Sequence, residues 1–261
     1  MLRAFSLSLL LFSFCLGGVS FASSPVQEVR GDFKATTDQA KFVKALAKAL
    51  DPESMTVTFV DGPRENGEIS GLYLDVVGSS AGTDYRLDRF SLSGALVRLT
   101  PPAQWDVEDL ETFRPSRWEG LFNAELLLRE STAQEALALF SRTQGDDQWR
   151  DLSVDFRPGK ILLEGTYRVN GGMRAVFKIT TGLELRRGKQ IWLANPEVQI
   201  NNDEQTQAIR SKIQEINPPA DFDKLGVPLV LRTIKITDKE LRIATGKSPR
   251  PLDGDTWKYV R

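Results

Sequence analysis

The reactive side chains of this chain are almost all carboxylates. The sequence of 261 residues contains no histidine and a single cysteine. Histidine-based acid–base catalysis, a Ser-His-Asp triad and metal sites built from histidine and cysteine are therefore excluded. A glycosidase needs two carboxylates that face each other across a cleft, which proximity in sequence does not establish. The close acidic groups are Glu108, Asp109 and Glu111, then Asp146 and Asp147, then Asp253 and Asp255.

We interpret these acidic groups as solvated surface or turn residues, because carboxylates are rarely buried. We accordingly expect no catalytic residue, no metal and no cofactor. The formal net charge of the chain is −1. A balanced charge gives no basic field over the surface, so nucleic acid is not an expected partner.

The N-terminus predicts export. Arg3 is followed by an apolar stretch from Phe5 to Val19, and Ser20 and Ala22 place small residues at the −3 and −1 positions of a cleavage site. This pattern is typical of a signal peptide that is cut after Ala22. The apolar stretch is too short to span a bilayer comfortably.

The spacing of apolar residues predicts helices near 38–50, 132–143 and 203–216, each followed by a group of strands. Apolar and polar residues alternate from 152 to 200, and Asn170-Gly171 is a strong hairpin signal there, so we expect an antiparallel meander. Further strands are predicted over 55–60, 69–77, 85–99, 121–129, 229–236 and 241–245.

This order predicts an α+β fold in which a long curved antiparallel sheet wraps around one or two helices. Four parts follow along the chain. We expect a signal peptide at 1–22, a flexible N-terminal segment at 23–35, a single α+β domain at 36–247 and an extended C-terminal tail at 248–261.

The segment Asn217–Lys247, NPPADFDKLGVPLVLRTIKITDKELRIATGK, is dense in leucine, valine and isoleucine. Its apolar pattern slips between Leu231 and Ile234, which predicts a bulge or bend. The segment resembles the LmeA-like phospholipid-binding family, chiefly through DFDKLGVPL and the strand, turn and strand that follow it. The passage Leu121–Leu139, LFNAELLLRESTAQEALAL, and the meander after it are similar to that family too.

The resemblance covers most of the mature chain, and the family consists of secreted bacterial envelope proteins. It implies a periplasmic or extracytoplasmic protein that is not an enzyme, with an architecture similar to tubular lipid-binding folds. Such a protein would hold or shuttle a phospholipid or polyprenyl lipid in an apolar groove and so support envelope biogenesis. The implied partner is a membrane lipid, with transient contact to a membrane surface, and the family supplies no catalytic residues.

From the apolar strand pattern we take as candidate groove residues Leu229, Leu231, Ile234, Ile236, Leu241, Ile243, Phe177 and Ile179. Candidates for a headgroup or membrane contact are Trp105, Arg114, Arg117 and Trp118, because tryptophan anchors at membrane interfaces and arginine binds phosphate. The alternative for the two tryptophans is that they cover one end of the core.

Two other functions remain open from the sequence. A secreted scaffold or adaptor would have a filled core and an exposed apolar patch for protein contacts. An acidic hydrolase would bring two carboxylates together in a cleft and raise the pKa of one of them.

The N-terminal pattern makes the first testable prediction. N-terminal sequencing of the exported protein should begin near Ser23, because cleavage is expected after Ala22. Recovery of the uncleaved chain in the cytosol would contradict it.

Overall fold

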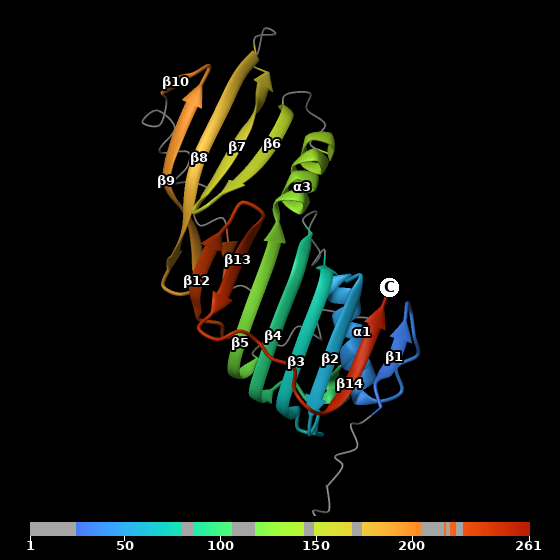
Figure 1. Cartoon of the computed structure of the whole chain (residues 1–261). Coiled ribbons are helices and arrows are strands. Elements are labelled where there is room, and N and C mark those ends of the chain that lie inside the picture. Colours follow the sequence, from blue (N-terminus) through green and yellow to red (C-terminus); the bar gives the residue numbers. More distant parts are fainter. Residues whose placement is uncertain are drawn as a thin grey trace, which may run out of the picture.

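Strands dominate the fold. The computed structural model describes residues 25–79, 86–105, 118–143, 149–168, 174–204, 217, 220–222 and 227–261. Within these ranges the chain forms two large, curved and open sheets, together with the α-helices α1 and α3 (Figure 1). The expected α+β class with curved antiparallel sheets is therefore confirmed.

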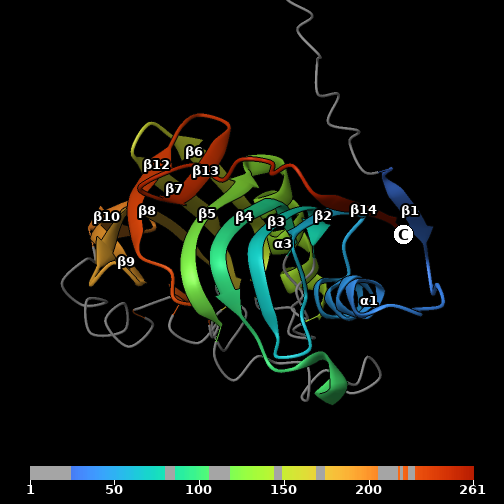
Figure 2. The same ribbon diagram turned by 90° about the horizontal axis from the view of Figure 1, so that it is seen from below.

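Sheet one has eight strands. In spatial order they are β1 (Gln27–Arg30), β14 (Asp255–Val260), β2 (Ser54–Val60), β3 (Glu68–Ser79), β4 (Leu87–Arg98), β5 (Glu119–Arg129), β13 (Glu240–Thr245) and β12 (Leu231–Ile236). All neighbours are antiparallel except β1 and β14, which are parallel. Figure 2 shows β3, β4 and β5 bending in an arc around the side on which α1 lies.

Helix α1 (Asp38–Leu50) matches the range predicted from its apolar spacing. It begins where the Thr37 side chain accepts a hydrogen bond from the backbone N–H of Ala40 at 3.2 Å. It ends at Asp51, which takes the left-handed conformation with φ 40° and donates its N–H to the Ala47 carbonyl. The apolar face of the helix is buried against sheet one.

The core under α1 is centred on Phe42, whose side chain is fully buried. The Phe42 ring meets Phe59 edge-on, with ring centroids 5.4 Å apart. Such edge-to-face pairs stabilise a core by about 0.5–1.5 kcal/mol beyond the area they bury. We call the buried residues under α1 the helix-side cluster; its strand members include Met55, Phe59, Ile69, Leu72, Leu92, Trp257 and Tyr259.

Sheet two is the predicted meander. Its strands are β6 (Trp149–Arg157), β7 (Lys160–Arg168), β8 (Arg174–Arg186), β9 (Gln190–Ile200) and β10 (Asp203–Glu204), and β11 (Ala220–Asp221) also pairs with β9. All these pairs are antiparallel, as expected from the alternation of apolar and polar residues. The Asn170-Gly171 turn lies outside the described residues. So does the helix predicted over 203–216, apart from residues 203–204, which form β10.

Helix α3 (Glu130–Thr143) closes the free edge of β6. The Gln134 amide donates to the Leu152 carbonyl and accepts from the Val154 N–H, both at 2.9 Å. The Glu130 carboxylate accepts the N–H of Phe156. These side chains satisfy the backbone groups that a neighbouring strand would otherwise bind, so the edge is covered by a helix.

The two ends of the chain differ from the expectation of a flexible segment and an extended tail. β14 inserts between β1 and β2, and β1 pairs with its far side. Trp257 and Tyr259 are buried in the helix-side cluster, while Lys258 between them is exposed. The strand forms because this alternation over a few residues matches the two faces of the sheet.

The position of β14 makes a prediction about stability. Trp257 is 6% exposed, and its indole N–H donates to the Gln39 side chain at 2.9 Å. Trp257→Ala should lower the free energy of unfolding by about 3–5 kcal/mol, because it leaves a cavity in the core. Lys258→Ala is the matched control and should change it by at most about 0.5 kcal/mol. Equal denaturation midpoints for the two variants would contradict the placement of β14.

Candidate functional site

One row of apolar side chains crosses the inner face of sheet one, the face that α1 covers. Cross-strand pairing places its six residues side by side on six strands: Met55, Val76, Phe90, Leu126, Ile243 and Ile234. Met55 and Val76 lie in the helix-side cluster, and Ile243 lies in a second cluster at the other end. Phe90 and Leu126, between them, are only half-buried. The middle of this face is thus apolar but incompletely covered.

The hairpin of β12 and β13 forms the far end of the inner face. A register shift separates Leu231 from Thr233, where β12 carries one residue more than β13. The bulge predicted between Leu231 and Ile234 is thereby confirmed. Its effect is to turn Leu231 to the same face as Ile234, because side chains otherwise alternate along a strand.

Sheet two meets this hairpin end-on. The Leu231 N–H donates to the Gly188 carbonyl at 2.7 Å, and the Gly159 N–H donates to the Ile236 carbonyl at 3.1 Å. Gly188 and Gly159 lie in the β8–β9 and β6–β7 turns, so the turns of sheet two rest on the edge strand of sheet one. We call the apolar contact between the sheets the junction cluster; its buried members are Phe156, Ile191, Leu231, Ile236, Leu241 and Ile243.

Four of the eight candidate groove residues therefore belong to a packed junction. Leu231, Ile236, Leu241 and Ile243 are 3–7% exposed. Leu229 is also buried, but in the helix-side cluster.

The other three candidates, Ile234, Phe177 and Ile179, are half-buried. These three are the ones with surface left for a ligand, and the structure adds Phe90 and Leu126 to them. The register of β4 and β5 could not be predicted from the sequence, so these two residues were missed.

Phe222 links the two clusters, since it packs against both. Its backbone N–H donates to the Lys189 carbonyl at 2.9 Å, which ties the segment after β11 to the β8–β9 turn. Val227 and Leu229 lie at the helix-side cluster, so the described residues of DFDKLGVPL contact both clusters.

The apolar face continues along sheet two. Leu163 and Ile179 are cross-strand partners, and Phe177 faces Gly165 on the neighbouring strand. A Cβ at Gly165 would come within 2.7 Å of the Phe177 ring, so the glycine makes room for that ring. β8 has 13 residues, which span roughly 40 Å at 3.3 Å per residue.

The two tryptophans proposed for a headgroup contact lie in the core. Trp105, which follows the 3-10 helix η1 (Pro102–Gln104), and Trp118 are each 8% exposed. Their rings lie 5.7 and 6.2 Å from that of Phe42, centroid to centroid. The structure therefore has them covering one end of the core, the alternative derived from the sequence. Arg114 and Arg117 lie outside the described residues, and the headgroup contact stays a prediction.

Several carboxylates of sheet one form ion pairs on its outer face. A groove of about 640 Å³ between β3, β4, β5 and the start of α3 is lined by both acidic and basic side chains. Asp75 binds the Arg89 guanidinium at 2.7 Å, and this hydrogen bond raises the pKa of Arg89. Asp88 accepts from the Thr132 hydroxyl and from the backbone N–H of Arg129. These contacts bind Asp75 and Asp88 to side chains and backbone of neighbouring strands and of α3.

The remaining acidic groups lie either on the surface or outside the described residues. Asp253 and Asp255 are exposed at the start of β14, and Asp255 accepts from the Gln39 amide. Glu108, Asp109, Glu111, Asp146 and Asp147 lie outside the described residues. Among the residues that are described, no helix is long and apolar enough to cross a membrane.

Comparison with known proteins gives one result. A family model described as LmeA-like phospholipid-binding matches residues 39–246. This range runs from the first turn of α1 to the residue after β13. Searches of curated proteins and of solved structures returned no match.

The bulge in β12 makes a prediction about the junction. Deleting Arg232 removes the extra residue and turns Leu231, now 3% exposed, toward the outer face. We expect a loss of about 1.5–3 kcal/mol in unfolding free energy, because a buried leucine becomes exposed. Arg232→Ala keeps the bulge and should change stability by less than about 0.5 kcal/mol. Chemical denaturation of both variants tests this, and a deletion as stable as the parent would show that the bulge does not orient Leu231.

Proposed function

Because the chain belongs to the LmeA-like phospholipid-binding family, we propose that it holds a phospholipid in an apolar groove along the inner faces of its two sheets. The observation that carries the proposal is the half-buried middle of the inner face, around Phe90 and Leu126. Apolar residues flank it on both sides, under α1 and at the junction cluster. An acyl chain bound there would bury the apolar surface that the described residues leave partly exposed.

Binding of this kind needs no reactive residue. Each buried methylene contributes about 0.8 kcal/mol, so two acyl chains are retained by apolar contact area. Specific polar groups are then needed only at the headgroup. We accordingly propose a non-enzymatic role, in which the protein holds or shuttles a phospholipid or polyprenyl lipid.

The place of action is part of the proposal. The predicted signal peptide at 1–22 supports export to the periplasm or another extracytoplasmic part of the envelope. An aqueous compartment between membranes or outside one is where a lipid carrier is useful, since free lipid is insoluble there. Support of envelope biogenesis follows as the proposed role.

A filled core that acts through protein contacts is the competing function, and one observation favours it. Leu231, Ile236, Leu241 and Ile243 are packed against other side chains. The groove we propose therefore excludes these residues and is confined to the half-buried ones.

Ile234 and Ile243 are direct cross-strand partners and allow a paired test. Ile243, at 5% exposed, is buried in the junction cluster, whereas Ile234 is half-buried. Ile243→Asn should lower the melting temperature clearly, because a buried amide without a partner costs about 1–3 kcal/mol. Ile234→Asn should keep most of the stability but hold less lipid.

The measurement combines thermal melting with native mass spectrometry and lipid extraction of the purified mature protein. Lys235→Asn, an exposed change on the same strand, is the control and should alter neither. The filled core would be favoured by two results together. The parent would yield no extractable lipid, and Ile234→Asn would lower the melting temperature as much as Ile243→Asn does.

A further inference from the structure

Two leucines at one end of sheet one are exposed to an unusual degree. Leu96 is 74% exposed and Leu121 is 70% exposed, the highest values among the large apolar side chains of the described residues. Leu121 faces Ala95, the residue before Leu96, across the β4–β5 pair. Ala95 is exposed as well. The three side chains form an apolar tip at the end of β4 and β5 farther from α3, and we call it the leucine tip.

The backbone holds Leu96 in an unfavourable conformation. Its φ is 54°, in the left-handed region, and the register shifts between Ala95 and Arg98. Leucine rarely adopts this conformation, which asparagine and glycine tolerate. Next to it, Val97 is 1% exposed and anchored in the helix-side cluster. The bulge therefore keeps Val97 in the core while Leu96 stands out from the surface, and bulges of this kind occur next to functional sites.

Leu121 points outward because its neighbour is fixed on the inner side. Phe122 packs against the helix-side cluster, with its ring 5.9 Å from that of Trp118. Its cross-strand partner is Gly94, where a Cβ would lie 2.6 Å from the Phe122 ring. With Phe122 held inside, alternation along the strand places Leu121 on the outer face.

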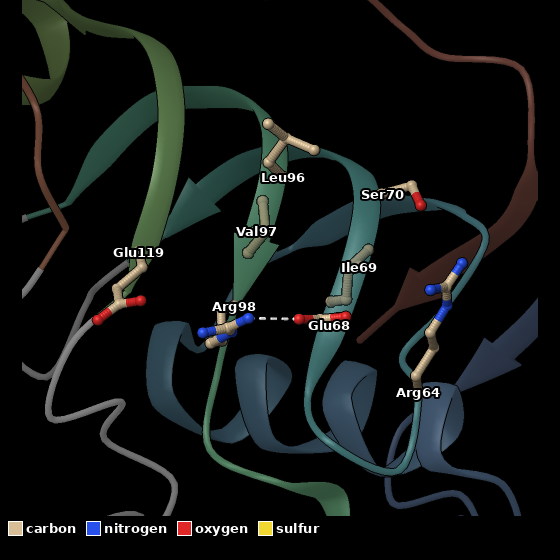
Figure 3. A pocket seen from close by; sticks show the side chains of 8 residues that line it. All are labelled: Arg64, Glu68, Ile69, Ser70, Leu96, Val97, Arg98 and Glu119. Atoms are coloured by element: carbon tan, nitrogen blue, oxygen red, sulfur yellow. Dashed lines mark hydrogen bonds and ion pairs between the residues drawn. The ribbon is translucent and has the colours of Figure 1, made fainter.

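The rim of the leucine tip is charged but nearly neutral. Figure 3 shows Leu96 pointing away from the ion pair of Arg98 and Glu68, which lies in a pocket of about 300 Å³. Arg64 binds Asp61 in the same way. The hydrogen bond from Arg98 lowers the pKa of Glu68 and so favours its charged form. Both arginines of the described rim have carboxylate partners, so these two do not form a free cationic patch.

We propose that the leucine tip is the surface through which the protein docks on a phospholipid bilayer, with Leu96 and Leu121 inserted among the headgroups. The choice of a bilayer rests on the proposed function, since a lipid carrier must meet a membrane to load and unload. Two leucines fall far short of the roughly 800 Å² per partner that a stable protein interface buries. A few inserted apolar side chains are enough for reversible attachment to a bilayer.

The neutral rim specifies how the bilayer is bound. Attachment through polybasic segments depends on anionic lipid and falls with salt. In the part of the rim that the structure describes, Arg64 and Arg98 are paired, so we assign the binding free energy to insertion of the leucines. Docking should therefore occur on zwitterionic vesicles and change little with ionic strength.

The test uses the double variant Leu96→Asn with Leu121→Ser and vesicles of phosphatidylcholine. Sedimentation with the vesicles should weaken about tenfold, the effect expected from losing two partly inserted leucines. The single variant Leu96→Asn should melt at the same or a higher temperature, because asparagine tolerates a positive φ. If Leu96 served only to pack the fold, Leu96→Asn would lower the melting temperature and leave vesicle binding unchanged. Val176→Ser, which removes a 55% exposed valine on sheet two, is the matched control and should bind vesicles like the parent.

Lipid extracted from the same preparations separates this inference from the proposed function. Retained lipid in the double variant, with weakened vesicle binding, supports both. Vesicle binding by a parent that holds no lipid supports the docking surface and contradicts the carrier. The docking surface is overturned if the double variant sediments like the parent, if the parent does not bind the vesicles, or if its binding falls steeply with salt. A further outcome is that the parent associates with itself and fails to bind vesicles, while the double variant stays monomeric. That result would overturn the docking proposal and identify the leucine tip as a protein interface.

Discussion

The architecture depends on the need to cover one continuous apolar surface. The row that runs from Met55 to Ile234 across the inner face of sheet one cannot be left in water, and a single helix is too narrow to cover it. Helix α1 covers one end, and the turns of sheet two rest on the other. Helix α3 covers the edge of sheet two, because its side chains bind the backbone of β6. What remains between the two covers is the part of the face assigned to lipid.

The two faces of sheet one differ in the polarity of their side chains. The inner face is apolar, whereas the outer face carries charged groups that neutralise one another, as Arg89 and Asp75 do. The leucine tip is the exception on the outer side, and it occurs where a bulge interrupts the regular alternation of β4.

Much of this could be predicted where periodicity is local. The helix at 38–50, the meander and the bulge after Leu231 are each encoded within a few residues, and the structure contains them. β14 was missed, although Trp257 and Tyr259 alternate with Lys258, because a six-residue pattern at a chain end is also compatible with a loose tail. The register between strands distant in sequence is not encoded locally either. Pairing of β4 with β5 decides that Phe90 and Leu126 meet, and it also decides that Leu96 is exposed beside a buried Val97.

The insertion of β14 between β1 and β2 also bears on the order in which the chain can fold. Residues 27–30 find their partner only when residues 255–260 are present, so this end of sheet one cannot be completed before β14 has been made. Contacts so distant in sequence slow folding, because a long loop must close before they form. Until β14 is in place, the edge of β2 is open and Trp257 and Tyr259 are missing from the helix-side cluster, so the core under α1 stays incomplete.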